Sequence, residues 1–290
     1  MEQIKPKKSL SQNFLRDKNI ARKIVEAADI KDDDTVIEIG PGTGALTEIL
    51  LTKNIKLIAI EIDNRAIDYL SEKFPVSVYP NFTLIHSDIR EYRIPPLQKG
   101  GRGDLSSSPP LQKGGRGDLK YKIIGNLPYN ISSDILFWIF ENSDVIDSAV
   151  IMLQKEVARR LSAKPRTKDY GILSVAAGLA GNSKTAFDVS PGCFYPKPEV
   201  TSSIVVINLN YTESIFTEYK DIMKLVKAAF GQRRKVLSNS LRCYLSDIST
   251  LDYHSVLLKC KEDIFDLSSK RAEELSKEDF INLYLFFKNL

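Results

Sequence analysis

The sequence predicts an α/β protein in which a doubly wound parallel sheet is followed by a smaller helical domain. From residue 35 to residue 209, short apolar runs rich in Val and Ile alternate with stretches of helical periodicity. That alternation is typical of a parallel sheet covered by helices. After residue 210 the strand-like runs stop, and apolar residues recur at helical spacing. We therefore expect two domains, residues 1–210 and residues 211–290.

Six segments have the length and composition of buried strands. They are Val36–Ile39, Leu57–Ile60, Thr83–Ile85, Lys122–Ile124, Ser148–Leu153 and Ser203–Leu209. Helical periodicity fills three of the gaps between them, at Ala45–Leu51, Arg65–Phe74 and Ser133–Glu141. Ahead of the first strand, Asp17 can cap a helix whose apolar residues recur at helical spacing, namely Ile20, Ile24, Val25 and Ala28. Beyond residue 210, amphipathic helices are expected around Ile222–Phe230 and Val236–Leu241.

Composition excludes several kinds of protein. The longest apolar runs, such as Ile135–Phe140, fall far short of the about 20 residues that a membrane span needs, and no apolar leader follows the basic start of the chain. The three cysteines lie far apart, and the two histidines form no metal-ligand spacing. We expect a cytoplasmic monomer with no disulfide, no bound metal and no membrane partner.

The net charge of +4 conceals three basic segments. Residues 155–168 carry a net charge of +5, residues 222–246 carry +6, and residues 1–10 carry +2. A single run of this kind is usually a solvated helix face. Three such runs in one chain favour a polyanionic partner, and we expect that partner to be a nucleic acid.

One segment repeats itself. Residues 95–105 spell PPLQKGGRGDL, and residues 109–119 spell it again after three serines. The repeat is rich in Gly, Pro and charge and nearly devoid of apolar residues, so burial cannot offset the entropy lost on ordering it. We expect a disordered insertion at residues 95–119. The alternative is an RNA-binding arm, because Lys-Gly-Gly-Arg-Gly resembles Gly/Arg-rich tails, although such tails carry many more copies.

A glycine-rich turn closes the first strand, in Glu38-Ile39-Gly40-Pro41-Gly42-Thr43-Gly44. Glycines there let a ligand approach the backbone at the carboxyl end of the strand. Their spacing differs from the fingerprint that holds a pyrophosphate, which favours a nucleoside ligand without phosphates. Glu61 ends the second strand, where an acid can accept from both hydroxyls of a ribose, and Asp88 ends the third, where it can accept from an adenine amino group. Together these strand ends predict an adenosine site.

The fourth strand ends in Asn126-Leu127-Pro128-Tyr129. An adenine amino nitrogen is a poor nucleophile because its lone pair is delocalised into the ring, and acceptors on both of its hydrogens would rehybridise it. The side-chain oxygen of Asn126 and the main-chain oxygen of Leu127 can accept them, while Pro128 fixes the turn and removes a competing N–H. Tyr129 can stack on a base swung out of its strand. The alternative is a structural turn with a buried Tyr, which the adjacent nucleoside site makes less favoured.

Together these motifs resemble those of the ribosomal RNA adenine dimethyltransferase family, over nearly the whole chain except the repeat. Lys8-Ser9-Leu10-Ser11-Gln12-Asn13-Phe14-Leu15 looks like the opening motif of that family. The resemblance implies a Rossmann-like methyltransferase domain with S-adenosylmethionine as its cofactor. The residues it assigns to the cofactor are Asn13, Leu15, Gly40, Gly42, Glu61, Asp88 and Asn126. The residues it assigns to catalysis are Asn126, Leu127, Pro128 and Tyr129.

Two further segments match the family. Phe194-Tyr195-Pro196-Lys197-Pro198-Glu199-Val200 resembles its Phe-x-Pro-x-Pro-x-Val motif, which implies that Phe194 and Tyr129 clamp the flipped adenine. From the residues alone, Phe194 can equally be a core aromatic beside a stiff loop. In the second domain, the segment Phe230-Gly231-Gln232-Arg233-Arg234-Lys235 also matches the family. This match implies that Arg233, Arg234 and Lys235 contact RNA phosphates.

Residues 152–158, MLQKEVA, and residues 170–175, YGILSV, look like the small-subunit branch of the family. Members of that branch methylate N6 of two adjacent adenines in a hairpin loop near the 3′ end of small-subunit rRNA, within an assembling ribosomal subunit. Three alternatives remain open. They are the branch that modifies one adenine in large-subunit rRNA, a non-catalytic assembly factor, and a nicotinamide-dependent dehydrogenase suggested by the glycine turn alone.

Overall fold

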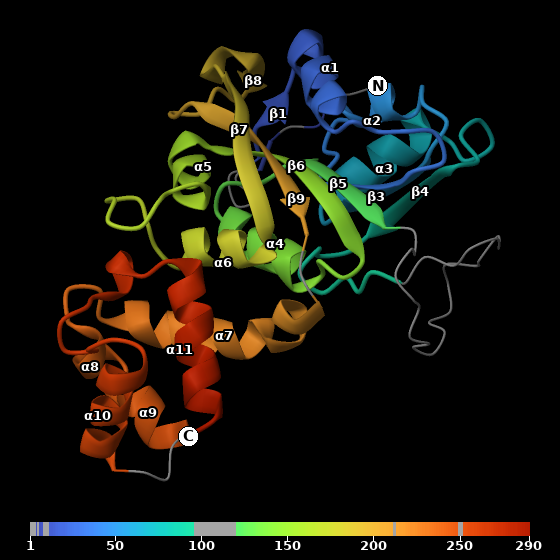
Figure 1. Ribbon diagram of the computed structural model, residues 1–290. Helices are drawn as coiled ribbons and strands as arrows, with labels where there is room; N and C mark the ends of the chain where they lie inside the picture. The colour runs from blue at the N-terminus through green and yellow to red at the C-terminus, as the bar shows by residue number, and fades with distance from the viewer. Residues whose placement is uncertain (1–3, 5, 8–11, 96–119, 211–212, 249–251) are drawn as a thin grey trace. The chain divides into compact units, whose positions relative to one another are not determined.

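The computed structural model describes residues 4, 6–7, 12–95, 120–210, 213–248 and 252–290. The chain divides into two compact units (Figure 1), the first made of Met1–Ala158 with Lys184–Asn210 and the second of Arg159–Ser183 with Tyr211–Leu290. Apart from Pro95, the insertion expected at residues 95–119 lies outside the described residues. The same holds for residues 8–11 of the opening motif.

A seven-stranded sheet organises the first unit, in the order β4-β3-β2-β5-β6-β9-β7. Its strands are β2 (Thr35–Ile39), β3 (Lys56–Glu61), β4 (Phe82–His86), β5 (Tyr121–Asn126), β6 (Ile146–Gln154), β7 (Gly181–Val189) and β9 (Ser202–Leu209). The pairs from β4 through β6 are parallel, and β9 runs antiparallel to β6. All six predicted strands are confirmed. Because β2 to β5 are parallel, their carboxyl ends meet at one edge of the sheet.

The helices expected in the first unit are present. The first, α1 (Lys18–Ala27), is capped by Asp17, whose carboxylate accepts from the main-chain N–H groups of Asn19 and Ile20 at 2.9 and 3.1 Å. The others are α2 (Thr47–Leu50), α3 (Asn64–Lys73) and α4 (Ser132–Glu141), with a 3₁₀ turn at Pro191–Cys193. A further helix, α5 (Lys155–Leu161), begins in the first unit and ends in the second. The apolar faces of α1, α2 and α3 pack on the sheet in one buried cluster.

Three strands of the structure have no counterpart in the prediction. One is β7, which lies at the edge of the sheet and is mostly exposed or half-buried, so it lacks the apolar run that marks a buried strand. The other two, β1 (Phe14–Leu15) and β8 (Phe194–Tyr195), are two residues long and pair antiparallel with each other. Only a contact between distant parts of the chain defines such a pair.

The second unit is helical, as expected. It contains α6 (Ile172–Ala180), α7 (Glu213–Gly231), α8 (Leu237–Ser240), α9 (Arg242–Ile248), α10 (Tyr253–Asp263) and α11 (Lys277–Lys288), with a 3₁₀ turn at Ala272–Glu274. Residues 159–183, which the prediction placed in the first domain, belong to this unit. The nearly apolar α6 packs against α7 and α11, and the Tyr170 hydroxyl donates to the main-chain oxygen of Leu275 at 2.6 Å. A boundary placed after the last strand could not reveal this contact.

Gly44 occupies a position where a side chain does not fit. Its φ is +80°, and a Cβ there would lie 2.8 Å from the Phe74 ring and 3.0 Å from Leu70. We predict that Gly44→Ala lowers the free energy of unfolding by about 1–3 kcal/mol, because backbone strain and overpacking both oppose it. Urea unfolding measures the change. Gly192→Ala is the matched control, since it lies in the same unit with only Ser190 Oγ within 4 Å of its Cβ, at 3.9 Å. Equal losses in both variants would contradict the prediction.

Candidate active site

The carboxyl ends of β2, β3 and β5 border a cavity of about 270 Å³. The N-terminal segment Gln12–Leu15, the residues that lead into α2, the start of the turn after β5 and Arg90 also line it. The predicted site residues that line it are Asn13, Leu15, Gly40, Gly42, Glu61, Asn126, Leu127, Pro128 and Tyr129. Most of the residues predicted for cofactor binding and all those predicted for catalysis therefore share one cavity.

The glycine-rich turn after β2 lies close to two other parts of the cavity wall. Gly40 and Gly42 have φ values of +66° and +56°, which favour glycine. A Cβ at Gly42 would lie 3.0 Å from the Phe14 ring, and one at Gly40 would lie 3.8 Å from the main-chain oxygen of Asn126. The absence of side chains here lets the turn, the N-terminal segment and the end of β5 surround the same space.

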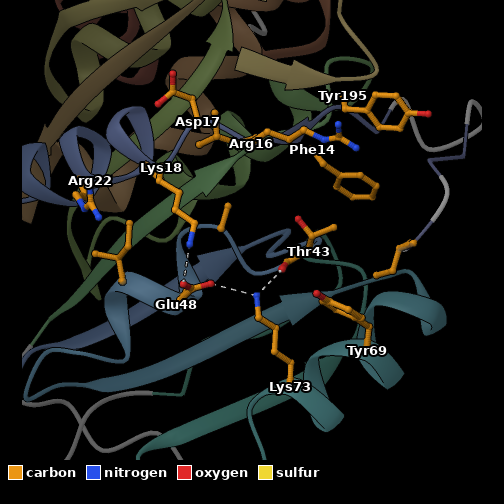
Figure 2. A pocket seen from close by; sticks show the side chains of 15 residues that line it. Phe14, Arg16, Asp17, Lys18, Arg22, Thr43, Glu48, Tyr69, Lys73 and Tyr195 are labelled. Atoms are coloured by element: carbon orange, nitrogen blue, oxygen red, sulfur yellow. Dashed lines mark hydrogen bonds and ion pairs between the residues drawn. The ribbon is translucent and has the colours of Figure 1, made fainter. Parts of the chain in front are cut away.

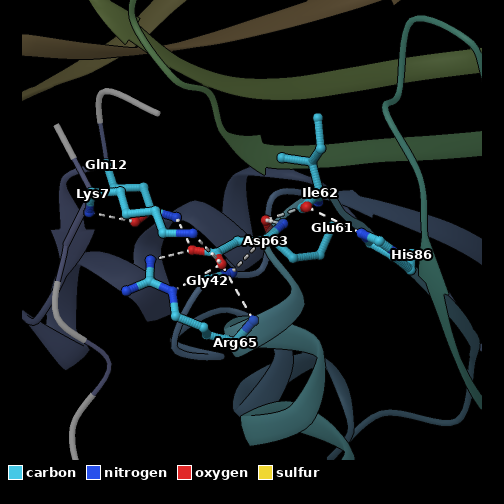
Figure 3. Close-up of polar contacts among 8 residues, drawn as sticks. All are labelled: Lys7, Gln12, Gly42, Glu61, Ile62, Asp63, Arg65 and His86. Atoms are coloured by element: carbon cyan, nitrogen blue, oxygen red, sulfur yellow. Dashed lines mark hydrogen bonds and ion pairs between the residues drawn. The ribbon is translucent and has the colours of Figure 1, made fainter. Parts of the chain in front are cut away.

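Glu61 is held rigidly at the end of β3 (Figure 3). One carboxylate oxygen accepts from the main-chain N–H groups of Ile62 and Asp63 at 2.9 and 3.0 Å, and the other accepts from Gly42 at 3.1 Å. The side chain is buried, and burial raises the pKa of Glu61 above its ordinary value. A carboxylate oxygen can accept two hydrogen bonds. The oxygen bonded to Gly42 therefore retains capacity for a ligand hydroxyl.

Asp63 ties the N-terminal segment to the loop after β3 (Figure 3). Its carboxylate accepts from Gln12 Nε2 at 2.9 Å and from Arg65 Nε at 3.0 Å, and Lys7 Nζ lies 3.7 Å away. The Arg65 guanidinium holds the pKa of Asp63 well below its usual range. Gln12 belongs to the opening motif, but the sequence predicts no role of its own for it. In the structure it anchors the segment that carries Asn13.

The side chain of Asn126 is oriented by the same segment. Its Nδ2 donates to the main-chain oxygen of Asn13 at 2.9 Å. The amide nitrogen is thereby engaged, which leaves Oδ1 as the atom that can accept from a ligand. Three residues on, the Tyr129 hydroxyl shares a hydrogen bond with Ser202 Oγ at 2.7 Å, which fixes the ring beside the cavity.

Asp88 does not line the cavity, whereas Arg90 does. Arg90 Nε lies 3.0 and 3.1 Å from the two carboxylate oxygens of Asp88, and Nη2 lies 2.6 Å from one of them. This guanidinium lowers the pKa of Asp88. Arg90 Nη1 also lies 3.7 Å from Asp134 of α4. The acid predicted to meet an adenine amino group is therefore paired with an arginine that no sequence pattern had marked.

Phe194 does not line the cavity itself. In the β1–β8 pair it lies opposite Leu15, which does line the cavity. Its own side chain is 5% exposed and belongs to the buried core. This burial is what a core aromatic shows, and the role of Phe194 in clamping the flipped adenine stays a prediction.

In the second unit, Arg233, Arg234 and Lys235 are exposed, and Arg233 is also bound by neighbouring groups. Arg233 Nε lies 2.9 Å from Glu273, and its Nη2 donates to the main-chain oxygen of Lys168 at 3.0 Å. The two most basic segments of the chain therefore meet within this unit, with part of their charge neutralised.

The described residues contain no group of three or more His, Cys, Asp or Glu side chains that could hold a metal. Cys193, Cys243 and Cys260 are free thiols. In the same part of the chain, no helix has both the length and the apolar character to cross a membrane.

Comparisons with known proteins show what this chain is similar to. The model of the ribosomal RNA adenine dimethylase family matches residues 3–287. Ribosomal RNA small subunit methyltransferase A of Syntrophus aciditrophicus is 41% identical over 283 residues, covering 97% of this chain and 93% of that protein. A dimethyladenosine transferase from Plasmodium falciparum has a TM-score of 0.77 at 26% identity, covering 95% of this chain and 98% of its own. The 23S rRNA methyltransferase ErmE, with a TM-score of 0.63 and 23% identity, covers 95% of this chain and 100% of its own and shows the fold alone.

Glu38 is a buried acid in the lining of the cavity. The pH dependence of stability tests how its carboxyl group is buried. Its Oε2 accepts from Thr47 Oγ1 at 2.7 Å, and burial raises the pKa of Glu38 to about 8 from an ordinary value of 4.5. The unfolded chain therefore releases this proton at lower pH than the folded chain, so stability falls as pH rises from about 4.5 to about 8. We predict that Glu38→Gln, which stays neutral, removes this part of the dependence of the free energy of unfolding on pH.

Urea unfolding between pH 5 and pH 9, at about one-unit steps, measures that slope. Glu72→Gln is the matched control, because Glu72 is an exposed residue of α3 that does not line the cavity. The control should keep the slope of the unmodified chain. If Glu38→Gln keeps it as well, Glu38 is not the group that gives rise to it.

Proposed function

Because this chain belongs to the ribosomal RNA adenine dimethylase family, we propose that it methylates N6 of two adjacent adenines in small-subunit rRNA. Its methyl donor is S-adenosylmethionine. One structural observation supports the proposal most strongly, namely that the glycine turn, Glu61 and Asn126 line one cavity at the carboxyl edge of the sheet. The proposed target lies in a hairpin loop near the 3′ end of that rRNA, within an assembling ribosomal subunit.

The choice of ribosomal subunit is supported by the relatives at 38–41% identity, each of which is named as a small-subunit methyltransferase. The large-subunit enzyme ErmE is only 23% identical. A nicotinamide-dependent dehydrogenase has no support beyond the glycine turn, and the family match argues against it. A purely structural assembly role would leave the Asn126 to Tyr129 motif without a use.

The residues around the cavity fit a nucleoside-bearing methyl donor. Gly40 and Gly42 leave the backbone open to the ligand, and Glu61 offers a buried acceptor for ribose hydroxyls. The segment that carries Asn13 and Leu15 closes the cavity beside them. When bound, S-adenosylmethionine supplies an electrophilic methyl carbon. At its adenine end we assign Asp88 together with Arg90, since the two form one hydrogen-bonded unit.

The chain's own contribution to the reaction is to orient and activate the target nitrogen. Asn126 Oδ1 and the main-chain oxygen of Leu127 accept the two hydrogens of the adenine amino group, which localises its lone pair on nitrogen. Pro128 offers no N–H that would compete. Tyr129, anchored through its hydroxyl to Ser202, stacks on the flipped base. Phe194 supports this site from the core, where its strand pairs with the strand of Leu15.

Contact with the RNA backbone is assigned to the second unit. Arg234 and Lys235 are exposed there, and Arg233 joins them if phosphate displaces Glu273. Such contacts position the RNA without reading its sequence. Because the proposed substrate is an assembling ribosomal subunit, we assign the protein to the cytoplasm. We also assign it as a monomer.

Methyl transfer from labelled S-adenosylmethionine to small subunits that lack this modification tests the proposal. The expected result is two methyl groups on each of two adjacent adenines, located by mass spectrometry of nuclease fragments. Large subunits serve as the control substrate and should remain unlabelled. Labelling of large-subunit rRNA alone would contradict the proposed substrate. Absence of any transfer, with the cofactor still bound, would favour the assembly role.

A further inference from the structure

A second cavity, of about 280 Å³, lies in the first unit and has no part in the mechanism above (Figure 2). It shares four lining residues with the active-site cavity, namely Phe14, Leu15, Thr43 and Ala45. The rest of its lining comes from Ile4, from Arg16 and Asp17 just before α1, from α1, α2 and α3, and from Tyr195 of β8. The two cavities therefore have a common wall, made by β1 and the glycine-rich turn.

The acids around this second cavity are already engaged. Glu48 binds Lys18 at 3.4 Å and Lys73 at 3.2 Å (Figure 2). Asp17 caps α1 through two main-chain N–H groups. Glu48 is therefore paired with two lysines, and Asp17 is engaged as the helix cap.

Two guanidinium groups in the lining are not neutralised in this way. The Arg16 guanidinium lies 4.0 Å from the centroid of the Tyr195 ring, and Arg22 Nη1 donates to the uncharged side chain of Asn19 at 3.1 Å. Within the described ranges, neither arginine forms an ion pair with a carboxylate. Unpaired guanidinium groups beside a cavity favour an anion with oxygen acceptors, such as a phosphate.

Aromatic rings line the same cavity. They belong to Phe14, Tyr69 and Tyr195. Tyr195 is 48% exposed, an unusual fraction for a large ring, and Arg16 lies against it. Guanidinium groups next to exposed aromatic faces are the combination with which proteins hold single-stranded nucleic acid, because bases stack on the rings while phosphates meet the cations.

We propose that this cavity, the Arg16–Tyr195 cavity, holds the nucleotide next to the target adenine, with its base on Tyr195 and its phosphate on Arg16, while Arg22 at the other end of the lining (Figure 2) meets another phosphate of the strand. The inference rests on the proposed function, since it needs a single-stranded RNA substrate. Asn13 contacts Asn126, and Arg16 follows three residues later through the extended strand β1, a span of about 10 Å. A base neighbouring the target can therefore reach it.

Equilibrium binding of a hairpin RNA with two adjacent adenines in its loop tests the role of the ring. Tyr195→Ala should weaken the RNA Kd by about 5- to 100-fold, which is the usual loss of one base–aromatic stack. Tyr195→Phe keeps the ring and should restore the affinity. Binding of S-adenosylmethionine, measured by calorimetry, should be the same in both variants and in the unmodified chain.

The salt dependence of the same RNA Kd tests the phosphate contact. Arg22→Gln should reduce the slope of log Kd against log salt by about 0.7, the value for one phosphate contact to a single strand. Lys23→Gln is the matched control, because it removes one charge from the next residue of α1, which does not line the cavity. That control should keep the slope of the unmodified chain.

The proposal is overturned if Tyr195→Ala and Arg22→Gln bind the RNA as Lys23→Gln does while methyl transfer by the unmodified chain proceeds. It is also overturned if these variants lose thermal stability without any change in RNA affinity, because the cavity would then be closed by the chain itself. If the unmodified chain transfers no methyl group to small subunits, the proposed function fails, and this inference fails with it.

Discussion

The hydrogen bond from Asn126 Nδ2 to the main-chain oxygen of Asn13, 2.9 Å long, is the contact on which the active site depends. It joins the end of a central strand to a segment 113 residues earlier in the chain. Because it uses the amide nitrogen, it leaves the amide oxygen of Asn126 as the acceptor that we propose for the target amino group. The same bond holds the N-terminal segment against the cavity, so one interaction orients both a residue proposed for the cofactor and a residue proposed for catalysis.

Two further contacts hold the N-terminal segment on either side of Asn13. Gln12 donates to Asp63, and Leu15 pairs with Phe194 across the β1–β8 ladder. The parallel sheet makes this arrangement possible, because it brings the ends of β2, β3 and β5 to one edge. Neighbouring acids then take different roles. Glu61 has main-chain donors and a raised pKa, whereas Asp63 has an arginine partner and a lowered one. The first suits a ligand acceptor and the second a structural anchor.

The parts of the fold that depend on local pattern could be predicted from the sequence. All six buried strands follow from apolar runs, and the cap of α1 follows from Asp17. The strand ends and the Asn126 to Tyr129 turn predict most of the cavity lining, because parallel strands fix where their last residues meet. The role of Asn13 came only from the family resemblance, since nothing in the spacing relates it to Asn126.

The parts that depend on distant contacts could not be predicted in this way. The β1–β8 pair, the placement of residues 159–183 in the second unit and the pairing of Arg90 with Asp88 each arise only when the chain is folded. The edge strand β7 was not predicted for another reason. It is largely exposed, so it lacks the apolar run by which buried strands are recognised. Phe194 shows the limit of a motif, because nothing in the motif predicts that this side chain is buried.

The rate of methyl transfer by Asn126→Ala tests the central role of this residue most directly. The variant loses the acceptor for the amino hydrogen, so the single-turnover rate should fall by about 100-fold or more, while the Kd values for RNA and S-adenosylmethionine change by less than about threefold. Asn81→Ala, an exposed asparagine outside the cavity, is the control and should keep the rate. A rate for Asn126→Ala within about threefold of the unmodified chain would contradict the role assigned to this side chain.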